Sequence, residues 1–134
     1  QQCAVIMALN RDLSLGSEII VGETVRSSDG LALSSRNAYL SVRERKKALS
    51  LSSGLFAARE LWKSGEKAAE KLKSVVANEI LSGDLEVSVE IDYVSVSDES
   101  RFIEVGSVEG PGNAIILVAA KIGTTRLIDN VLLV

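Results

Sequence analysis

The residues best suited to chemistry stand in one short loop, residues 29–37, with the sequence Asp-Gly-Leu-Ala-Leu-Ser-Ser-Arg-Asn. Gly30 allows a sharp backbone turn. Ser34 and Ser35 offer short hydroxyl donors, and Arg36 offers a planar guanidinium that matches phosphate oxygens. This order favours an anionic ligand. It is also consistent with a polar surface loop before a helix, since serine is common at helix starts.

Histidine is absent from all 134 residues, which limits the chemistry of this loop. Any reaction assigned to it must avoid histidine or use one from outside this sequence. The loop is not a Walker A motif, because the glycine spacing and the Lys-Ser/Thr pair are missing, and no Gly-x-Gly-x-x-Gly occurs. The single Cys3 has no disulfide partner, no zinc-ligand partners and no activating histidine, which favours a reducing compartment.

Three further charged groups have structural interpretations. The basic run at residues 43–47 stands at an expected helix start, where positive charge is mildly unfavourable. A nearby anion would explain it, but we favour a solvated face. Acidic residues within 84–92 alternate with apolar ones, which predicts the wet face of a strand rather than a catalytic carboxylate pair. We expect Arg126 and Asp129 to form a buried ion pair that holds the last strand.

The composition is that of a globular protein, with 46% hydrophobic and 25% charged residues. A formal net charge of −3 and only 4% aromatic residues argue against a nucleic-acid binder, which needs a basic face and stacking platforms. The longest apolar run, residues 114–120, is strand-sized and much shorter than the roughly 20 residues of a membrane span. The sequence therefore predicts neither a nucleic-acid nor a membrane partner.

The pattern of residues 1–40 predicts the end of a larger α/β domain. Apolar residues at helical spacing predict a helix from the N-terminus to about Gly16, and residues 18–21 then predict a short buried strand. One such αβ unit cannot bury both faces of its strand. We therefore expect further domain sequence before Gln1.

The pattern of residues 41–134 predicts an α+β subdomain. Ser41 and Glu44 form a capping-box pattern at the start of a helix that ends at Ser64 and Gly65. The pattern then predicts a helix over 66–81, strands over 87–96, 113–122 and 126–133, a bulge near Tyr93, and a helical turn over 98–103. The sum is two helices beside a small antiparallel sheet.

Three segments in this order resemble the pantoate–β-alanine ligase family. They are Gln-Gln-Cys-Ala-Val-Ile at residues 1–6, the loop of residues 24–41 with Asp-Gly-Leu-Ala-x-Ser-Ser-Arg-Asn, and residues 114–120 followed by Arg-Leu-Ile-Asp-Asn. The resemblance is collinear over essentially the whole chain. It implies a Rossmann-like nucleotidylyl-transferase domain that ends at residues 1–40 with the ATP-phosphate loop, and a C-terminal α+β lid over residues 41–134.

The resemblance also implies a two-step reaction in the cytoplasm. Pantoate and MgATP give a pantoyl adenylate and pyrophosphate, and the amine of β-alanine then displaces AMP to give pantothenate. Family members of this kind are expected to be homodimers. Positioning and charge stabilisation at the α-phosphate carry such a reaction.

The resemblance assigns roles to individual residues of this chain. Gln2 matches the glutamine that binds pantoate, and the backbone of Val25 matches the position that reads the adenine ring. Ser34, Ser35 and Arg36 match the catalytic ATP-phosphate loop, and no metal ligand is assigned. Leu33 stands where the family usually has methionine beside the nucleotide, and leucine keeps most of that apolar volume.

The family's two-histidine signature and its upstream pantoate-binding residues would lie before Gln1. We therefore expect this chain to be inactive alone, as part of an enzyme whose active site is completed elsewhere. The alternative is a non-catalytic truncated product that acts as an interaction or folding module. A bare nucleotide-binding module is a third possibility, and it would bind MgATP without any other chain.

Overall fold

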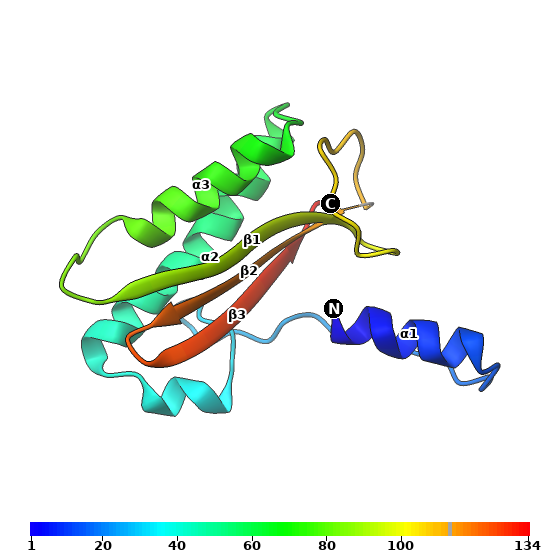
Figure 1. The fold of residues 1–134 in the computed structure, drawn as a ribbon, viewed down its shortest axis with the longest axis horizontal. Coiled ribbons are helices and arrows are strands. Elements are labelled where there is room, and N and C mark those ends of the chain that lie inside the picture. Colours follow the sequence, from blue (N-terminus) through cyan, green and yellow to red (C-terminus); the bar gives the residue numbers. More distant parts are fainter. Residues whose placement is uncertain (113) are drawn as a thin grey trace.

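The computed structural model describes residues 1–112 and 114–134. Figure 1 shows two layers, with α2 and α3 packed on one face of a three-stranded sheet and α1 extending away from this body. The helices are α1 (Gln2–Asp12), the 3-10 helix η1 (Ser35–Tyr39), α2 (Val42–Lys63) and α3 (Ala69–Leu81). The strands are β1 (Val89–Asp98), β2 (Ala114–Ile122) and β3 (Thr125–Leu132). Among the helices of the described residues, none combines the length and the apolar character needed to cross a membrane.

The capping box predicted at the start of α2 is confirmed. The Ser41 hydroxyl accepts the Glu44 amide at 3.2 Å, and the Glu44 carboxylate accepts the Ser41 amide at 2.8 Å. Both donors would otherwise lack partners at the helix start. The next helix, α3, begins at Ala69 rather than at residue 66, because the Glu66 carboxylate accepts the Ala68 amide at 2.9 Å and so holds the segment before Ala69 outside the helix.

The core lies between the two helices and the inner face of the sheet. Leu55 of α2, Leu72 of α3 and Ile116 of β2 are fully buried in it. Gly54 lets the helices approach closely, since a Cβ there would lie 3.1 Å from the carbonyl oxygen of Val76. The buried residues of each helix recur at helical spacing, so one face of each helix belongs to the core.

The sheet has the strand order β1-β2-β3 with antiparallel neighbours, as predicted. A register shift between Ile91 and Tyr93 confirms the bulge. Residues 99–101 form the predicted turn, closed by the Phe102 amide on the Asp98 carbonyl at 2.9 Å. The predicted strand start at Asn113 lies outside the described residues.

The predicted buried strand at residues 18–21 is wrong. This segment has no regular structure, and Ile20 is 84% exposed. A strand forms only where a neighbouring strand accepts and donates its backbone hydrogen bonds. No described segment is paired with residues 18–21. The preceding helix also ends earlier than predicted, at Asp12 instead of near Gly16, and none of its residues is buried.

The predicted Arg126–Asp129 ion pair is also wrong. Residues three apart on a strand point to opposite faces, so these side chains diverge. The Arg126 guanidinium instead pairs with Asp92 of β1 at 2.5 Å, and Asp129 pairs with Arg26 at 2.7 Å. The last strand is thus tied to two distant parts of the chain.

The basic run at the start of α2 meets carboxylates of the protein itself. Arg43 pairs with Asp84 at 2.8 Å, and Arg45 pairs with Asp29 at 2.8 Å. The buried Lys47 donates to the Ser82 carbonyl. The favoured solvated face is confirmed for Arg43 and Lys46, which are exposed, and is wrong for the buried Lys47.

Truncation of the core tests the packing of α2. Leu55→Ala removes a fully buried side chain and leaves a cavity, so we expect the free energy of unfolding to fall by about 2–5 kcal/mol. Urea denaturation followed by circular dichroism measures this loss. Val42→Ala is the control, because Val42 is 88% exposed on the same helix. Equal denaturation midpoints for the two variants would contradict the packing described.

Candidate functional site

The loop between α1 and α2 contains a tight turn that the sequence specifies locally. Arg26 and Ala32 form an isolated antiparallel bridge, and the Ser27 amide donates to the Leu31 carbonyl at 2.9 Å. Gly30 has φ +95°, a conformation that favours glycine. Leu31, only 4% exposed, inserts into the core. The turn is therefore anchored to the helix–sheet body rather than free in solvent.

Asp29 fixes the tip of this turn. The Ser27 hydroxyl donates to its carboxylate at 2.5 Å, and the Arg45 guanidinium of α2 pairs with it at 2.8 Å. The Ser27 hydrogen bond, joined by Arg45, lowers the pKa of Asp29 below its ordinary value of 3.8. The carboxylate is thus charged at neutral pH, where it holds the turn to α2.

Ser34, Ser35 and Arg36 follow the turn directly. Ser34 is the N-cap of η1, and its hydroxyl accepts the Arg36 amide at 3.2 Å. All three residues are exposed. Upstream of them, the Leu33 amide donates to the Val25 carbonyl at 2.9 Å. The three predicted phosphate-binding residues are therefore exposed to solvent on a loop whose backbone is held by hydrogen bonds.

A small hollow of about 170 Å³ lies between this loop and the neighbouring strand β3. Leu33, Ser34 and Arg36 line it from the loop, and Arg126 and Asp129 line it from β3. Among the described residues, the Arg36 side chain has no ion-pair partner, whereas Arg126 is paired with Asp92. The Ser34 hydroxyl offers a hydrogen-bond donor and Arg36 a cation beside this hollow, and this combination suits an anion. The volume is below the roughly 300–1,000 Å³ of whole-ligand pockets and suits a phosphate group.

The other predicted site residues do not line this hollow. Gln2 is exposed on α1, and Val25 has a 67% exposed side chain while its carbonyl holds Leu33. Ser35 is exposed at the first position of η1. The structure thus groups Leu33, Ser34 and Arg36, and leaves Gln2 apart from them. Residues 1–112 and 114–134 contain no cluster of three or more His, Cys, Asp or Glu side chains that could hold a metal ion.

Two arginines near the site were not predicted from the sequence as site residues. Arg26 forms the contacts of the loop with β3, and Arg126 lines the hollow. Strand periodicity could have separated Arg126 from Asp129, because the two are three residues apart. No local pattern identifies Arg26 as the partner of Asp129, since 103 positions separate them.

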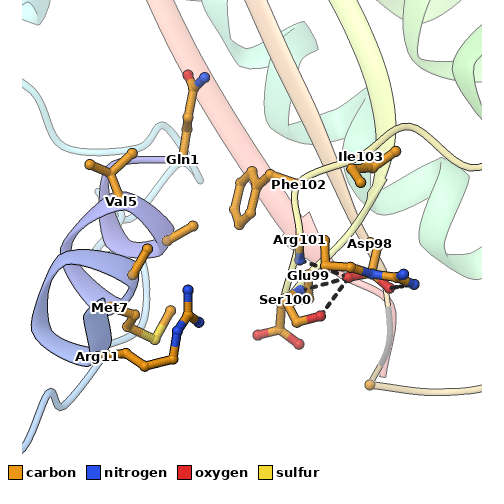
Figure 2. Close-up of a pocket in the computed structure, with 13 residues that line it drawn as sticks. Gln1, Val5, Met7, Arg11, Asp98, Glu99, Ser100, Arg101, Phe102 and Ile103 are labelled. Atoms are coloured by element: carbon orange, nitrogen blue, oxygen red, sulfur yellow. Dashed lines mark hydrogen bonds and ion pairs between the residues drawn. The ribbon is translucent and has the colours of Figure 1, made fainter. Parts of the chain in front are cut away.

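A larger hollow of about 850 Å³ lies between α1 and the turn after β1. Figure 2 shows Phe102 pointing into it toward α1. Two of its charged groups already have partners, since Asp98 accepts the Ser100 hydroxyl at 2.7 Å and Arg11 pairs with Asp12 at 2.9 Å. The Ser100 hydrogen bond, followed by the Arg101 amide, lowers the pKa of Asp98 to about 2. These groups serve the turn and the helix, so we place the candidate site at the smaller hollow.

Lowering the pH should destabilise the turn at residues 26–32, which precedes the candidate site. Because the pKa of Asp29 is lowered on folding, its contribution is present above the ordinary value of 3.8 and is lost as pH falls through the folded-state pKa. We expect the protection factors of the Ser27 and Gly30 amides, measured by NMR and corrected for the intrinsic pH dependence of exchange, to fall below that pH. Asp29→Asn should show the faster exchange already at pH 7. The control Asp12→Asn changes an exposed carboxylate outside the turn, and equal exchange in both variants would contradict this role of Asp29.

Comparison with known proteins gives a consistent family. The model of the pantoate-beta-alanine ligase family matches residues 1–132. The pantothenate synthetase of Myxococcus xanthus (strain DK1622) is 49% identical over 130 residues, which are 97% of this chain and 43% of that protein. The pantothenate synthetase of Acetivibrio thermocellus is 43% identical over 98% of this chain and 45% of its own length. The chain thus spans less than half the length of these curated relatives.

Solved structures agree with the sequence comparison. A crystal structure of pantothenate synthetase from Thermus thermophilus matches with a TM-score of 0.86 and 33% identity, over 98% of this chain and 46% of that chain. A pantoate-beta-alanine ligase from Francisella tularensis, complexed with beta-gamma ATP and beta-alanine, shares the fold with a TM-score of 0.57. It is 24% identical over 98% of this chain and 39% of its own.

Proposed function

The chain belongs to the pantoate-beta-alanine ligase family, and we propose that it supplies the ATP-phosphate loop and the lid of such an enzyme. The observation that carries the proposal is the grouping of Ser34 and Arg36 around a phosphate-sized hollow that Arg126 closes from β3. A ligase that activates a carboxylate with ATP needs cations and hydrogen-bond donors around the phosphates. The exposed Ser34, Ser35 and Arg36 offer both.

The proposed domain organisation explains why apolar side chains are exposed on helix α1. Residues 1–40 would end a Rossmann-like nucleotidylyl-transferase domain, and residues 41–134 would form its lid. The support is the surface of α1, where Val5 is 64% and Leu9 51% exposed. Apolar side chains on one helix become stable when a neighbouring element covers them. In this organisation, the Rossmann-like sheet covers them.

The proposed reaction has two balanced steps. A pantoate carboxylate oxygen attacks the α-phosphorus of ATP, and the bond to pyrophosphate breaks, which gives pantoyl adenylate. The β-alanine amine then attacks the acyl carbon, loses a proton and expels AMP, which gives pantothenate. Negative charge on the phosphoryl oxygens must be stabilised during the first step.

Each site residue has a proposed role in the first step. The Arg36 guanidinium binds phosphate oxygens through its planar fork, and Ser34 and Ser35 donate hydroxyl hydrogen bonds to them. Leu33 contacts the nucleotide through its apolar side chain, and the backbone of Val25 reads the adenine ring. Gln2 binds pantoate from α1.

Magnesium enters the proposal as the counter-ion of ATP. The described residues form no acidic cluster that fits an all-protein magnesium site, so no step is derived through the metal. The proposed partners are the small molecules pantoate, β-alanine and ATP, in a cytoplasmic enzyme that forms homodimers. No catalysis is proposed for this chain alone, because it contains no histidine of the family signature.

Removal of the Arg36 guanidinium tests the phosphate assignment. The assay uses a chimera in which residues 1–132 replace the matching segment of the Myxococcus xanthus pantothenate synthetase. Arg36→Ala should reduce kcat/KM for ATP by about 100-fold or more, since a charge-stabilising group is lost. Formation of AMP and pantothenate measures this. The melting temperature should hardly change, because Arg36 is exposed and has no ion pair among the described residues.

The matched control is Arg43→Ala, which removes another exposed arginine at a distance from the hollow. It should leave kcat/KM for ATP within about twofold of the unsubstituted chimera. Unchanged turnover in Arg36→Ala would remove the phosphate assignment. A chimera that makes no pantothenate even without substitution would contradict the proposed function.

A further inference from the structure

An ion pair that is largely shielded from water connects the candidate site to β3. The Arg26 guanidinium meets the Asp129 carboxylate through two parallel bonds, Nη1 to Oδ2 at 2.7 Å and Nη2 to Oδ1 at 2.8 Å. The side chain of Arg26 is 17% exposed and that of Asp129 3%. Bidentate pairs of this kind fix both distance and orientation, and loss of one partner leaves a poorly solvated charge.

We propose that Arg26 and Asp129 are a positioning pair for the phosphate-binding residues. The pair holds the loop in the conformation that presents Ser34 and Arg36 to the ATP phosphates. Neither residue needs to touch the nucleotide for this role. The inference deepens the proposed function and rests on it.

Besides its ion pair with Asp129, Arg26 forms hydrogen bonds to the turn and to β3. Its Nη1 also donates to the Gly30 carbonyl at 3.1 Å, and its Nη2 to the Asn130 carbonyl at 3.3 Å. One guanidinium thus joins the tip of the turn to two adjacent residues of β3. Lysine cannot replace it at equal strength, because an ammonium lacks the planar fork.

Helix α2 fixes the same guanidinium from a third direction. Arg26 lies over the Phe56 ring at 4.9 Å from its centroid, and Arg59 lies over that ring at 5.1 Å. A cation over an aromatic face is attracted by the ring quadrupole. The loop, β3 and α2 therefore meet at the Arg26 side chain.

The backbone next to Arg26 is hydrogen-bonded to the segment that precedes Ser34, Ser35 and Arg36. Its neighbour Val25 accepts the Leu33 amide at 2.9 Å, one residue before Ser34. Asp129, which holds Arg26, also lines the hollow with Ser34 and Arg36. A shift of Arg26 would move the Leu33–Ser34 backbone relative to β3, which forms the opposite wall of the hollow. Catalytic groups lose efficiency when misplaced by about 1 Å.

The test compares Asp129→Asn and Arg26→Lys in the chimera with a core variant. Asp129→Asn should raise KM for ATP at least tenfold, and Arg26→Lys should give a smaller increase because it keeps the charge. Val76→Ala is the matched control, since it destabilises the body from a fully buried position between the helices. Assayed below the melting temperatures of all variants, it should keep KM for ATP within twofold. Arg26→Lys keeps the test available if Asp129→Asn fails to fold.

A second readout does not depend on activity. In the 134-residue chain, Asp129→Asn or Arg26→Lys should speed hydrogen exchange of the Leu31 and Leu33 segment at least tenfold, with β2 unchanged. Unaltered exchange there, or a KM for ATP within twofold of the unsubstituted chimera, would overturn the inference. If the unsubstituted chimera is inactive, the proposed function fails, and hydrogen exchange alone decides whether the pair positions the loop.

Discussion

The placement of the site depends on the need to pair one buried carboxylate. Asp129 points to the inner side of an edge strand, where its side chain is 3% exposed. A buried carboxylate needs a cation and hydrogen-bond donors, and Arg26 supplies both from a distant loop. Because that loop is thereby fixed beside β3, a hollow forms between them with Arg36 on one wall and Arg126 on the other.

The arginines of the loop and of the neighbouring elements α2 and β3 differ in whether a carboxylate of the protein pairs with them. Arg26 is bound by Asp129, Arg45 by Asp29 and Arg126 by Asp92. Arg36 is the site arginine for which the described residues give no carboxylate partner. Structural pairs can hold a loop rigid while one exposed cation stays ready for a ligand, an arrangement that costs little reorganisation when an anion binds. This division underlies the choice of Arg36 as the proposed phosphate ligand.

The sequence predicted correctly those features that depend on neighbouring residues alone, such as a helix cap and a bulge. The capping box at Ser41 and the bulge near Tyr93 depend on residues within a few positions, and both are confirmed. Signals failed where a distant partner decides the outcome. Residues 18–21 have strand composition but no paired strand among the described residues, and Asp129 pairs with Arg26 rather than with Arg126. Strand periodicity argues against the Arg126–Asp129 pair, but it does not identify Arg26 as the distant partner of Asp129.

The most direct test of the account is AMP release from MgATP, pantoate and β-alanine. It should be measured with this chain alone, and again with the part of the Myxococcus xanthus synthetase that precedes the matching segment. The account predicts no AMP from the chain alone, and AMP together with pantothenate from the mixture. Turnover by the chain alone, or none in a mixture shown to form a complex, would contradict a shared active site completed by this loop and lid.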